Sequence, residues 1–183
     1  REDSARLAGE FMAAQRVQMA MLPNAELLQG DPRIELHATL QPAREVGGDL
    51  YDYFRLDEHR LFVLIGDVAG KGLSASIFMA VSKALYKNAM LRAPDADIGA
   101  VMRVANAEVS RDNAGNLFVT AFAAILDLNS GELSYCNAGH DNQREQKKAQ
   151  ADRSFVHVLA ASRSVSRSGP PEGRARSPSA PVR

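Results

Sequence analysis

The sequence predicts one α+β domain in which antiparallel strands are layered against helices. Strand-like apolar segments lie between residues 34 and 65 and again between 117 and 137, while apolar residues recur at helical spacing from 73 to 109. Strand runs that are separated from helix runs are typical of antiparallel layered folds, whereas a parallel doubly wound sheet needs strict alternation. With 183 residues, the chain is long enough for one such core plus appendages.

Charge and hydropathy argue against several classes of protein. The chain carries 22 basic and 22 acidic side chains, so no bulk charge argues for nucleic-acid binding. No stretch approaches the roughly 20 apolar residues that a membrane-spanning helix needs. The single Cys136 cannot form a disulfide within the chain, which favours a reduced, cytoplasmic setting. Because the sequence begins with Arg1 rather than Met, we expect it to be part of a longer protein.

Residues 1–23 are predicted to form an amphipathic helix with a linking or signalling role. One stripe along it advances in steps of three and four and ends before Pro23; its members are Leu7, Phe11, Ala14, Gln18 and Met21. This stripe either packs on the helix's own domain or forms the seam of a homodimer, and the sequence favours neither alternative.

A strand and a hairpin are predicted next. Residues 34–38 alternate apolar and polar side chains, and the apolar runs 50–56 and 61–65 flank a polar cluster at 57–60. Apolar runs around a short polar loop predict two antiparallel strands.

Two helices and two strands complete the regular part of the chain. One helix opens after Gly72 and ends before Pro94. Asp95 or Asp97 caps the second helix, whose predicted buried face consists of Ile98, Val101, Met102, Ala105 and Val109. Strands are predicted at residues 117–126 and 132–137, joined by a turn at 129–131.

The predicted hairpin brings two carboxylates close together. If its turn is centred between Glu58 and His59, Asp49 lies opposite Val68, one step from Asp67. Opposed side chains on neighbouring strands lie roughly 5 Å apart, and like charges there are destabilising unless something compensates. A divalent cation such as Mg²⁺ or Mn²⁺, which takes oxygen ligands, is the obvious compensation.

The glycines around these aspartates support the same interpretation. Gly47 and Gly48 precede Asp49, and the segment 66–72 (Gly-Asp-Val-Ala-Gly-Lys-Gly) surrounds Asp67. Such loops let backbone approach a ligand closely, and their carbonyls can coordinate metal. Either motif alone is more simply a strand-end turn with a solvated aspartate, but their pairing across one hairpin favours a metal site.

The segment 66–72 is not a nucleotide-binding P-loop. It is one residue short between its glycines, and Gly72 stands where Ser or Thr should hold Mg²⁺. Lys71 lies just before the predicted helix, where it is either a candidate to hold phosphate or an ordinary solvated loop lysine.

Three ordered segments together resemble a known family. Residues 46–52 (Val-Gly-Gly-Asp-Leu-Tyr-Asp), 66–72 and 137–140 (Asn-Ala-Gly-His) resemble the successive signatures of the SpoIIE/RsbU-type serine phosphatases, a bacterial branch of the protein phosphatase 2C-like superfamily. Residues 18–23 (Gln-Met-Ala-Met-Leu-Pro) resemble the helix that usually joins such a domain to an upstream sensor. The resemblance assigns residues 33–142 to a partial phosphatase domain.

This resemblance implies an αββα sandwich of two antiparallel sheets flanked by helices, with two Mn²⁺ or Mg²⁺ ions at one end of the sheets. Asp49 and Asp67 would be metal ligands and catalytic residues, and the Val68 carbonyl would be a third ligand. The implied reaction is direct attack of metal-activated water on phosphoserine or phosphothreonine. The implied substrate is a phosphorylated regulatory protein of the anti-sigma-factor antagonist type.

The roles of two further motif residues are less specific. Asp52 is expected to point to the opposite side of its strand from Leu50 and to brace a loop. His140 either belongs to the site or caps the end of its strand.

The sequence departs from the family pattern after Asn142. The family continues with further strands and a Thr-Asp-Gly motif whose aspartate completes the metal site, whereas residues 143–183 are basic and rich in Arg, Ser and Pro. We expect this tail to be disordered, apart from a short element at 155–161, and the sandwich to lack its last strands. The competing hypothesis is a catalytically inactive remnant that acts as a partner-binding or dimerising module.

Overall fold

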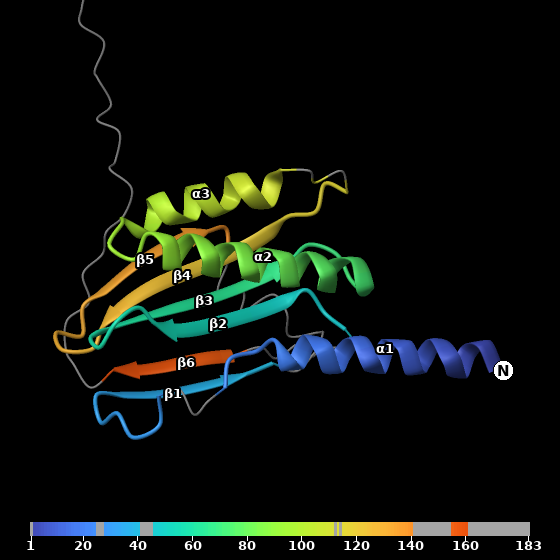
Figure 1. The fold of residues 1–183 in the computed structure, drawn as a ribbon, viewed down its shortest axis with the longest axis horizontal. Coiled ribbons are helices and arrows are strands. Elements are labelled where there is room, and N and C mark those ends of the chain that lie inside the picture. The colour runs from blue at the N-terminus through green and yellow to red at the C-terminus, as the bar shows by residue number, and fades with distance from the viewer. Residues whose placement is uncertain are drawn as a thin grey trace, which may run out of the picture.

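The computed structural model describes residues 2–24, 28–40, 46–111, 113, 115–140 and 155–160. Within these ranges three helices and six strands follow one another (Figure 1): α1 (Glu2–Ala20), β1 (Ile34–Thr39), β2 (Asp49–Arg55), β3 (Arg60–Val68), α2 (Leu73–Arg92), α3 (Ile98–Ser110), β4 (Val119–Asp127), β5 (Leu133–Ala138) and β6 (Phe155–Ala160). The predicted α+β class and its order of elements are confirmed.

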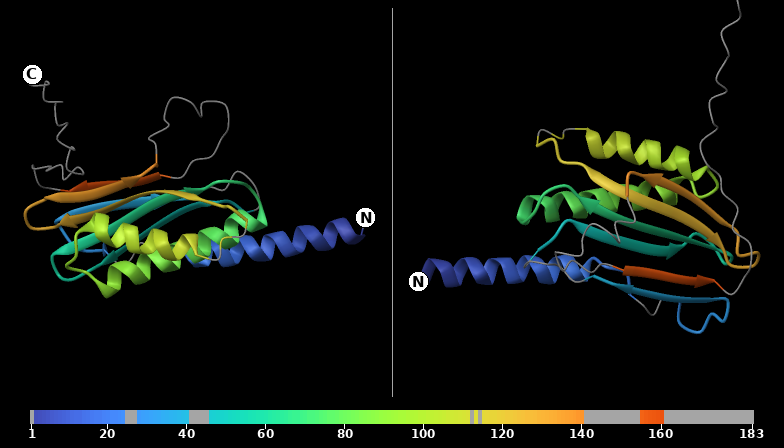
Figure 2. Two further views of the ribbon diagram at one scale, coloured as in Figure 1. Left: turned by 90° about the horizontal axis from the view of Figure 1, so that it is seen from above. Right: turned by 180° about the vertical axis from the view of Figure 1, so that it is seen from behind.

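The strands form two antiparallel sheets. One sheet has the order β2-β3-β4-β5, and the other pairs β1 with β6. Helices α2 and α3 cover one face of the larger sheet, and the β1-β6 sheet lies on its other side (Figures 1 and 2). One helical layer and two sheets of the expected αββα sandwich are thus present, and the described residues include no second helical layer.

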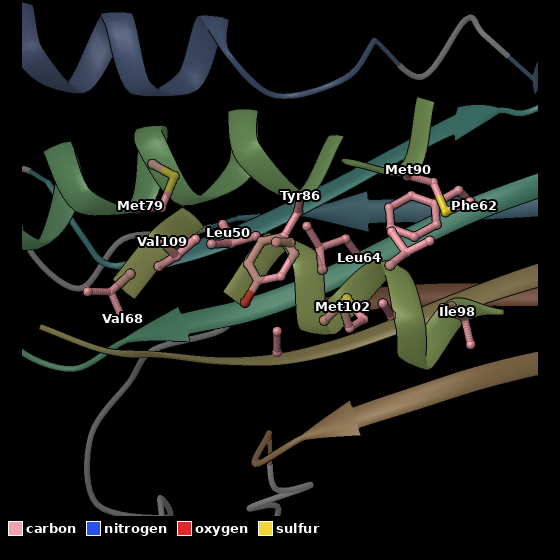
Figure 3. Close-up of a cluster of buried hydrophobic side chains, with 14 of the residues drawn as sticks. Leu50, Phe62, Leu64, Val68, Met79, Tyr86, Met90, Ile98, Met102 and Val109 are labelled. Atoms are coloured by element: carbon pink, nitrogen blue, oxygen red, sulfur yellow. The ribbon is translucent and has the colours of Figure 1, made fainter. Parts of the chain in front are cut away.

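Strands β2 and β3 of the larger sheet are buried on both faces, which explains their continuous apolar runs. Toward the helices, Leu50, Phe62 and Leu64 pack against α2 and α3 (Figure 3). Toward the second sheet, Tyr51 and Val63 join a separate cluster that includes residues of β1. A strand buried on both faces does not show polar alternation.

The hairpin register differs by one residue from the prediction. The Leu56 N–H donates to the Arg60 carbonyl over 2.9 Å, which closes a three-residue loop centred on Glu58. The Asp57 carboxylate accepts from the N–H groups of His59 and Arg60, both at 2.8 Å, and so replaces backbone partners within the turn. As a result Asp49 pairs with Asp67 and not with Val68.

The N-terminal helix contacts the domain through its C-terminal half. Among the stripe residues, Leu7 and Met21 are exposed, Phe11 is half-buried and Gln18 is buried. Figure 2 shows α1 extending beyond the sheets. Packing on its own domain is therefore seen at Gln18, and dimerisation through α1 stays a prediction. None of the described helices has the length and hydropathy that crossing a membrane requires.

Two local predictions can be followed in the structure. Asp97 is the N-cap of α3, where its carboxylate accepts from the Ala100 N–H over 3.0 Å. The short element expected at 155–161 is strand β6, which pairs with β1. Residues 143–154 and 161–183, which the sequence predicts to be disordered, lie outside the described residues.

Asp31 links the start of β1 to the hairpin and gives a pH prediction. Its carboxylate contacts Arg33 Nη2 at 2.8 Å and Arg55 Nη2 at 2.6 Å, and these hydrogen bonds lower the pKa of Asp31 well below its ordinary value of 3.8. A depressed pKa contributes stability above the unfolded-state value and loses it as pH falls through the folded-state value. Asp31→Asn should therefore lower the urea midpoint at pH 7, by an amount that shrinks below about pH 4.

The matched control is Asp95→Asn, because the Asp95 side chain is 84% exposed. The urea midpoint of this variant should stay close to that of the wild type at every pH between 7 and 3. A constant deficit of Asp31→Asn between pH 7 and pH 3 would contradict the assignment.

Candidate metal site

Two carboxylates meet at one end of the larger sheet. Asp49 opens β2 and Asp67 lies near the end of β3, and the register places them directly opposite each other. Directly opposed residues share a face, and their Cβ atoms lie roughly 5 Å apart. Both residues are half-buried. The two acids that the sequence selected are therefore brought together, one step closer than predicted.

The face on which they lie is the one that looks toward the second sheet. Side chains alternate along a strand, so Asp49 shares its face with Tyr51, and Asp67 shares its face with Val63. Tyr51 and Val63 belong to the cluster that packs between the sheets. The carboxylate pair therefore lies at the end of the space between the two sheets.

Beside this pair, the backbone of Gly48 lies unusually close to the backbone of Val68. The Val68 N–H donates to the Gly48 carbonyl over 3.2 Å, and a Cβ atom on Gly48 would lie 2.8 Å from the Val68 carbonyl oxygen. Real Cβ atoms essentially never come so near, so this approach requires glycine. It holds the Val68 carbonyl, the third predicted ligand, against the strand that carries Asp49.

Strand β4 supports Asp67 from its other side through Thr120, which lies opposite Asp67 in the register. The Thr120 hydroxyl donates to the Asp67 carbonyl over 3.3 Å, and its oxygen lies 3.2 Å from His140 Nδ1. No sequence motif contains Thr120. Its part in the site follows from the β3–β4 register, which local patterns do not determine.

The Asn-Ala-Gly-His segment folds back on itself. The Asn137 side-chain oxygen accepts from the His140 N–H over 2.9 Å, and its amide donates to the His140 carbonyl over 3.2 Å. Gly139 adopts a φ of 80°, in the left-handed region that favours glycine. This turn directs the His140 ring to Thr120 and so favours the strand-end interpretation of His140.

The expected orientation of Asp52 was wrong. Residues two apart on a strand point the same way, so Asp52 shares the helix-facing side with Leu50 and Phe54. Its buried carboxylate lies 2.7 Å from Lys83 Nζ of α2, and its other oxygen accepts from the Tyr53 N–H. Burial lowers the pKa of Lys83, and the hydrogen bond to Asp52 opposes that shift. Asp52 therefore anchors α2 to the sheet and does not brace a loop.

The site contains oxygen donors of the kind that hard cations prefer. Two carboxylates and a neighbouring carbonyl suit Mg²⁺ or Mn²⁺. Within the part of the chain that the structure covers, no group of three or more His, Cys, Asp or Glu residues could hold a metal ion. Among the described residues, the candidate metal site therefore contains two acidic side chains.

Two other residues considered from the sequence lie outside the carboxylate pair. Lys71 is exposed in the loop before α2. Cys136 is half-buried, and burial raises the pKa of its thiol, which disfavours a nucleophilic thiolate.

Comparisons with known proteins point to the family that the sequence motifs resemble. Residues 57–144 match the family model described as stage II sporulation protein E (SpoIIE). Protein IcfG of Synechocystis sp. is 31% identical over 58% of this chain and 21% of its own length. Phosphoserine phosphatase RsbU of Bacillus subtilis is 26% identical over 74% of this chain and 39% of its own length. The chain therefore spans well under half the length of either relative.

A solved structure shares the fold. The SiaA-PP2C domain of Pseudomonas aeruginosa superposes with a TM-score of 0.58 at 17% sequence identity, covering 73% of this chain and 55% of that one. At this identity the likeness concerns the fold.

The Asp52–Lys83 pair gives a stability prediction. Asp52→Asn leaves the buried Lys83 ammonium without its counter-charge and should lower the free energy of unfolding by about 3 kcal/mol. The double variant Asp52→Leu with Lys83→Met removes both charges and should recover most of that loss. Urea denaturation at pH 7 measures both.

Glu108→Gln is the control, because Glu108 forms an ion pair with Arg111 at the surface. It should cost less than about 1 kcal/mol. Equal losses for Asp52→Asn and Glu108→Gln would show that burial of the first pair is unimportant.

Proposed function

Since the chain carries a SpoIIE/RsbU-type domain of the protein phosphatase 2C-like fold, we propose that it removes phosphate from a phosphoserine or phosphothreonine of a regulatory protein, using divalent metal ions. The observation that carries this proposal is the direct pairing of Asp49 with Asp67. Two carboxylates so placed offer the oxygen donors that hard divalent cations prefer.

In this proposal Asp49, Asp67 and the Val68 carbonyl hold two Mn²⁺ or Mg²⁺ ions. Bound metal of this kind activates water and stabilises charge on the transferred phosphoryl group. The protein's own part is to keep the donors in place. Gly48 permits the close approach of the Val68 carbonyl, and Thr120 holds the backbone of Asp67.

We propose in addition that positive charge in the segment after Asp67 helps to hold the substrate phosphate. Lys71 lies in the loop that follows β3, and α2 begins directly after this loop, at Leu73. A helix N-terminus and an ammonium group both favour an anion. In this proposal Lys71 and the N-terminus of α2 hold the phosphate, and hydrolysis takes place at the carboxylate pair.

The partner proposed is a phosphorylated protein of the anti-sigma-factor antagonist type, acted on in the cytoplasm. This assignment rests on the family resemblance and on the relative named phosphoserine phosphatase RsbU. An upstream sensor would connect through α1, which leads directly into the domain.

Hydrolysis of p-nitrophenyl phosphate and of a phosphoserine peptide tests the activity. We expect turnover that requires Mn²⁺ or Mg²⁺ and stops with EDTA. Asp67→Asn should reduce the rate by about 100-fold or more, because it removes a ligand from the metal site.

Asp95→Asn, far along the sheet at the start of the α3 region, is the matched control and should retain wild-type turnover. If the wild-type chain shows no metal-dependent turnover above that of Asp67→Asn, the proposed enzymatic function is wrong. The competing hypothesis of an inactive, partner-binding or dimerising remnant would then take its place.

A further inference from the structure

One aromatic side chain is exposed near the carboxylate pair. Phe118, which directly precedes β4, is 61% exposed, and no other Phe or Tyr is exposed among the residues whose burial the structure describes. The other large exposed apolar side chains lie on or next to the three helices. Single exposed apolar residues are common on protein surfaces, so the case for Phe118 depends on where it lies.

The pairing of β3 with β4 places Phe118 on the face that carries Asp67. The register sets Asp67 opposite Thr120, and the Ala69 N–H extends the ladder by donating to the Phe118 carbonyl over 2.8 Å. Val68, between Asp67 and Ala69, packs toward the helices. Because side chains alternate along a strand, Phe118 and Thr120 lie on the other face, together with Asp67.

This position brings the Phe118 ring within reach of a peptide bound at the candidate metal site. Phe118 is the diagonal neighbour of Asp67 across the two strands. Cβ atoms of such neighbours lie roughly 7–8 Å apart, which an aromatic side chain can span. An extended peptide advances about 3.3 Å per residue. A peptide whose phosphorylated residue lies at the carboxylate pair therefore reaches Phe118 with a side chain about two residues away.

The segment before β4 is held by its own hydrogen bonds. The Asn113 side-chain oxygen accepts from the Leu117 N–H over 3.1 Å, and the Asn113 amide donates to the Leu117 carbonyl. The Leu117 side chain also approaches Gly70, where an added Cβ atom would lie 3.9 Å from Leu117 Cδ2. The residue before Phe118 is thus fixed at both backbone groups, which lowers the entropy cost of using the ring in binding.

We propose that Phe118 is a specificity-determining residue that binds an apolar side chain about two residues from the phosphorylated residue of the substrate protein. The inference rests on the proposed function, because it takes the phosphate to bind at the carboxylate pair. A largely exposed aromatic ring gains free energy when an apolar side chain covers it. The substrate is thereby narrowed to phosphorylated segments that carry a large apolar residue near the phosphate.

Two phosphoserine peptides test this inference. They differ only at the positions two residues before and two residues after the phosphoserine, where one peptide carries Leu and the other Ala. The measured quantity is the ratio of kcat/KM for the Leu peptide to kcat/KM for the Ala peptide, in the presence of Mn²⁺. This ratio does not depend on how much of a protein sample is active, so it separates recognition from a general loss of activity.

The wild type should prefer the Leu peptide by about tenfold. Phe118→Ala should reduce this preference to within about twofold, whereas Phe118→Leu should keep most of it because an apolar side chain remains. Both variants should unfold close to the wild-type urea midpoint, since the side chain is mostly exposed. Leu91→Ala is the matched control, because Leu91 is 52% exposed near the other end of α2, and it should keep the wild-type preference.

No preference in the wild type, or an equal preference in the wild type and Phe118→Ala, would overturn the inference and leave the proposed function standing. Loss of the preference in Leu91→Ala as well would also overturn it. If the wild type hydrolyses neither the peptides nor p-nitrophenyl phosphate, the proposed function is wrong, and fluorescence anisotropy of labelled peptides then decides the inference. Tighter binding of the Leu peptide that is lost in Phe118→Ala would support it, and equal dissociation constants would overturn it.

Discussion

The register of the β2–β3 hairpin is the constraint on which the rest of the structure depends. The register is fixed at the loop, where the Leu56 N–H donates to the Arg60 carbonyl and the Asp57 carboxylate caps the turn. At the other end of the hairpin, this register pairs Asp49 with Asp67. A slip by one residue would turn every side chain of one strand to the other face. The same pairing therefore decides both the packing of the core and the position of the carboxylates.

The core holds this register against the repulsion of the two acids. Two like charges about 4 Å apart repel each other by on the order of 4 kcal/mol at the effective dielectric constant of a protein surface. Burial of one Leu or Phe side chain contributes about 1.5–3 kcal/mol, and Leu50, Leu61, Phe62 and Leu64 are all almost completely buried on these two strands. Packing of these side chains outweighs the repulsion, so the core is sufficient to hold the two carboxylates opposite each other. The proposed metal site would therefore be arranged by the fold itself.

The sequence predicted the elements better than their registers. Periodicity located α2 and α3, turn residues located the hairpin, and Asp97 was one of two expected caps. The one-residue error in the register arose because the loop is closed by the Asp57 side chain, which a count of residues does not reveal. The role of Asp52 was mistaken because its face of the strand was misassigned, although strand alternation would have placed it toward α2.

Contacts between distant segments could not be predicted from local patterns. Thr120 lies beside Asp67 only because β4 pairs with β3, and β6 completes a sheet with β1 across most of the chain. The Gln18–Gly47 contact likewise joins a helix to a loop beyond an intervening strand. The Thr120 and Gln18 contacts hold the two glycine-rich segments that the sequence did identify, and the Gln18 contact connects α1 to the proposed metal-holding end of the sheet.

The most direct test of this account is to locate manganese by anomalous diffraction in crystals grown with Mn²⁺. If these residues hold the two proposed ions, the anomalous peaks lie at the Asp49 and Asp67 carboxylates, about 2.0–2.3 Å from their oxygens. Mn²⁺ bound elsewhere, or no peak between these carboxylates at saturating Mn²⁺, would contradict it.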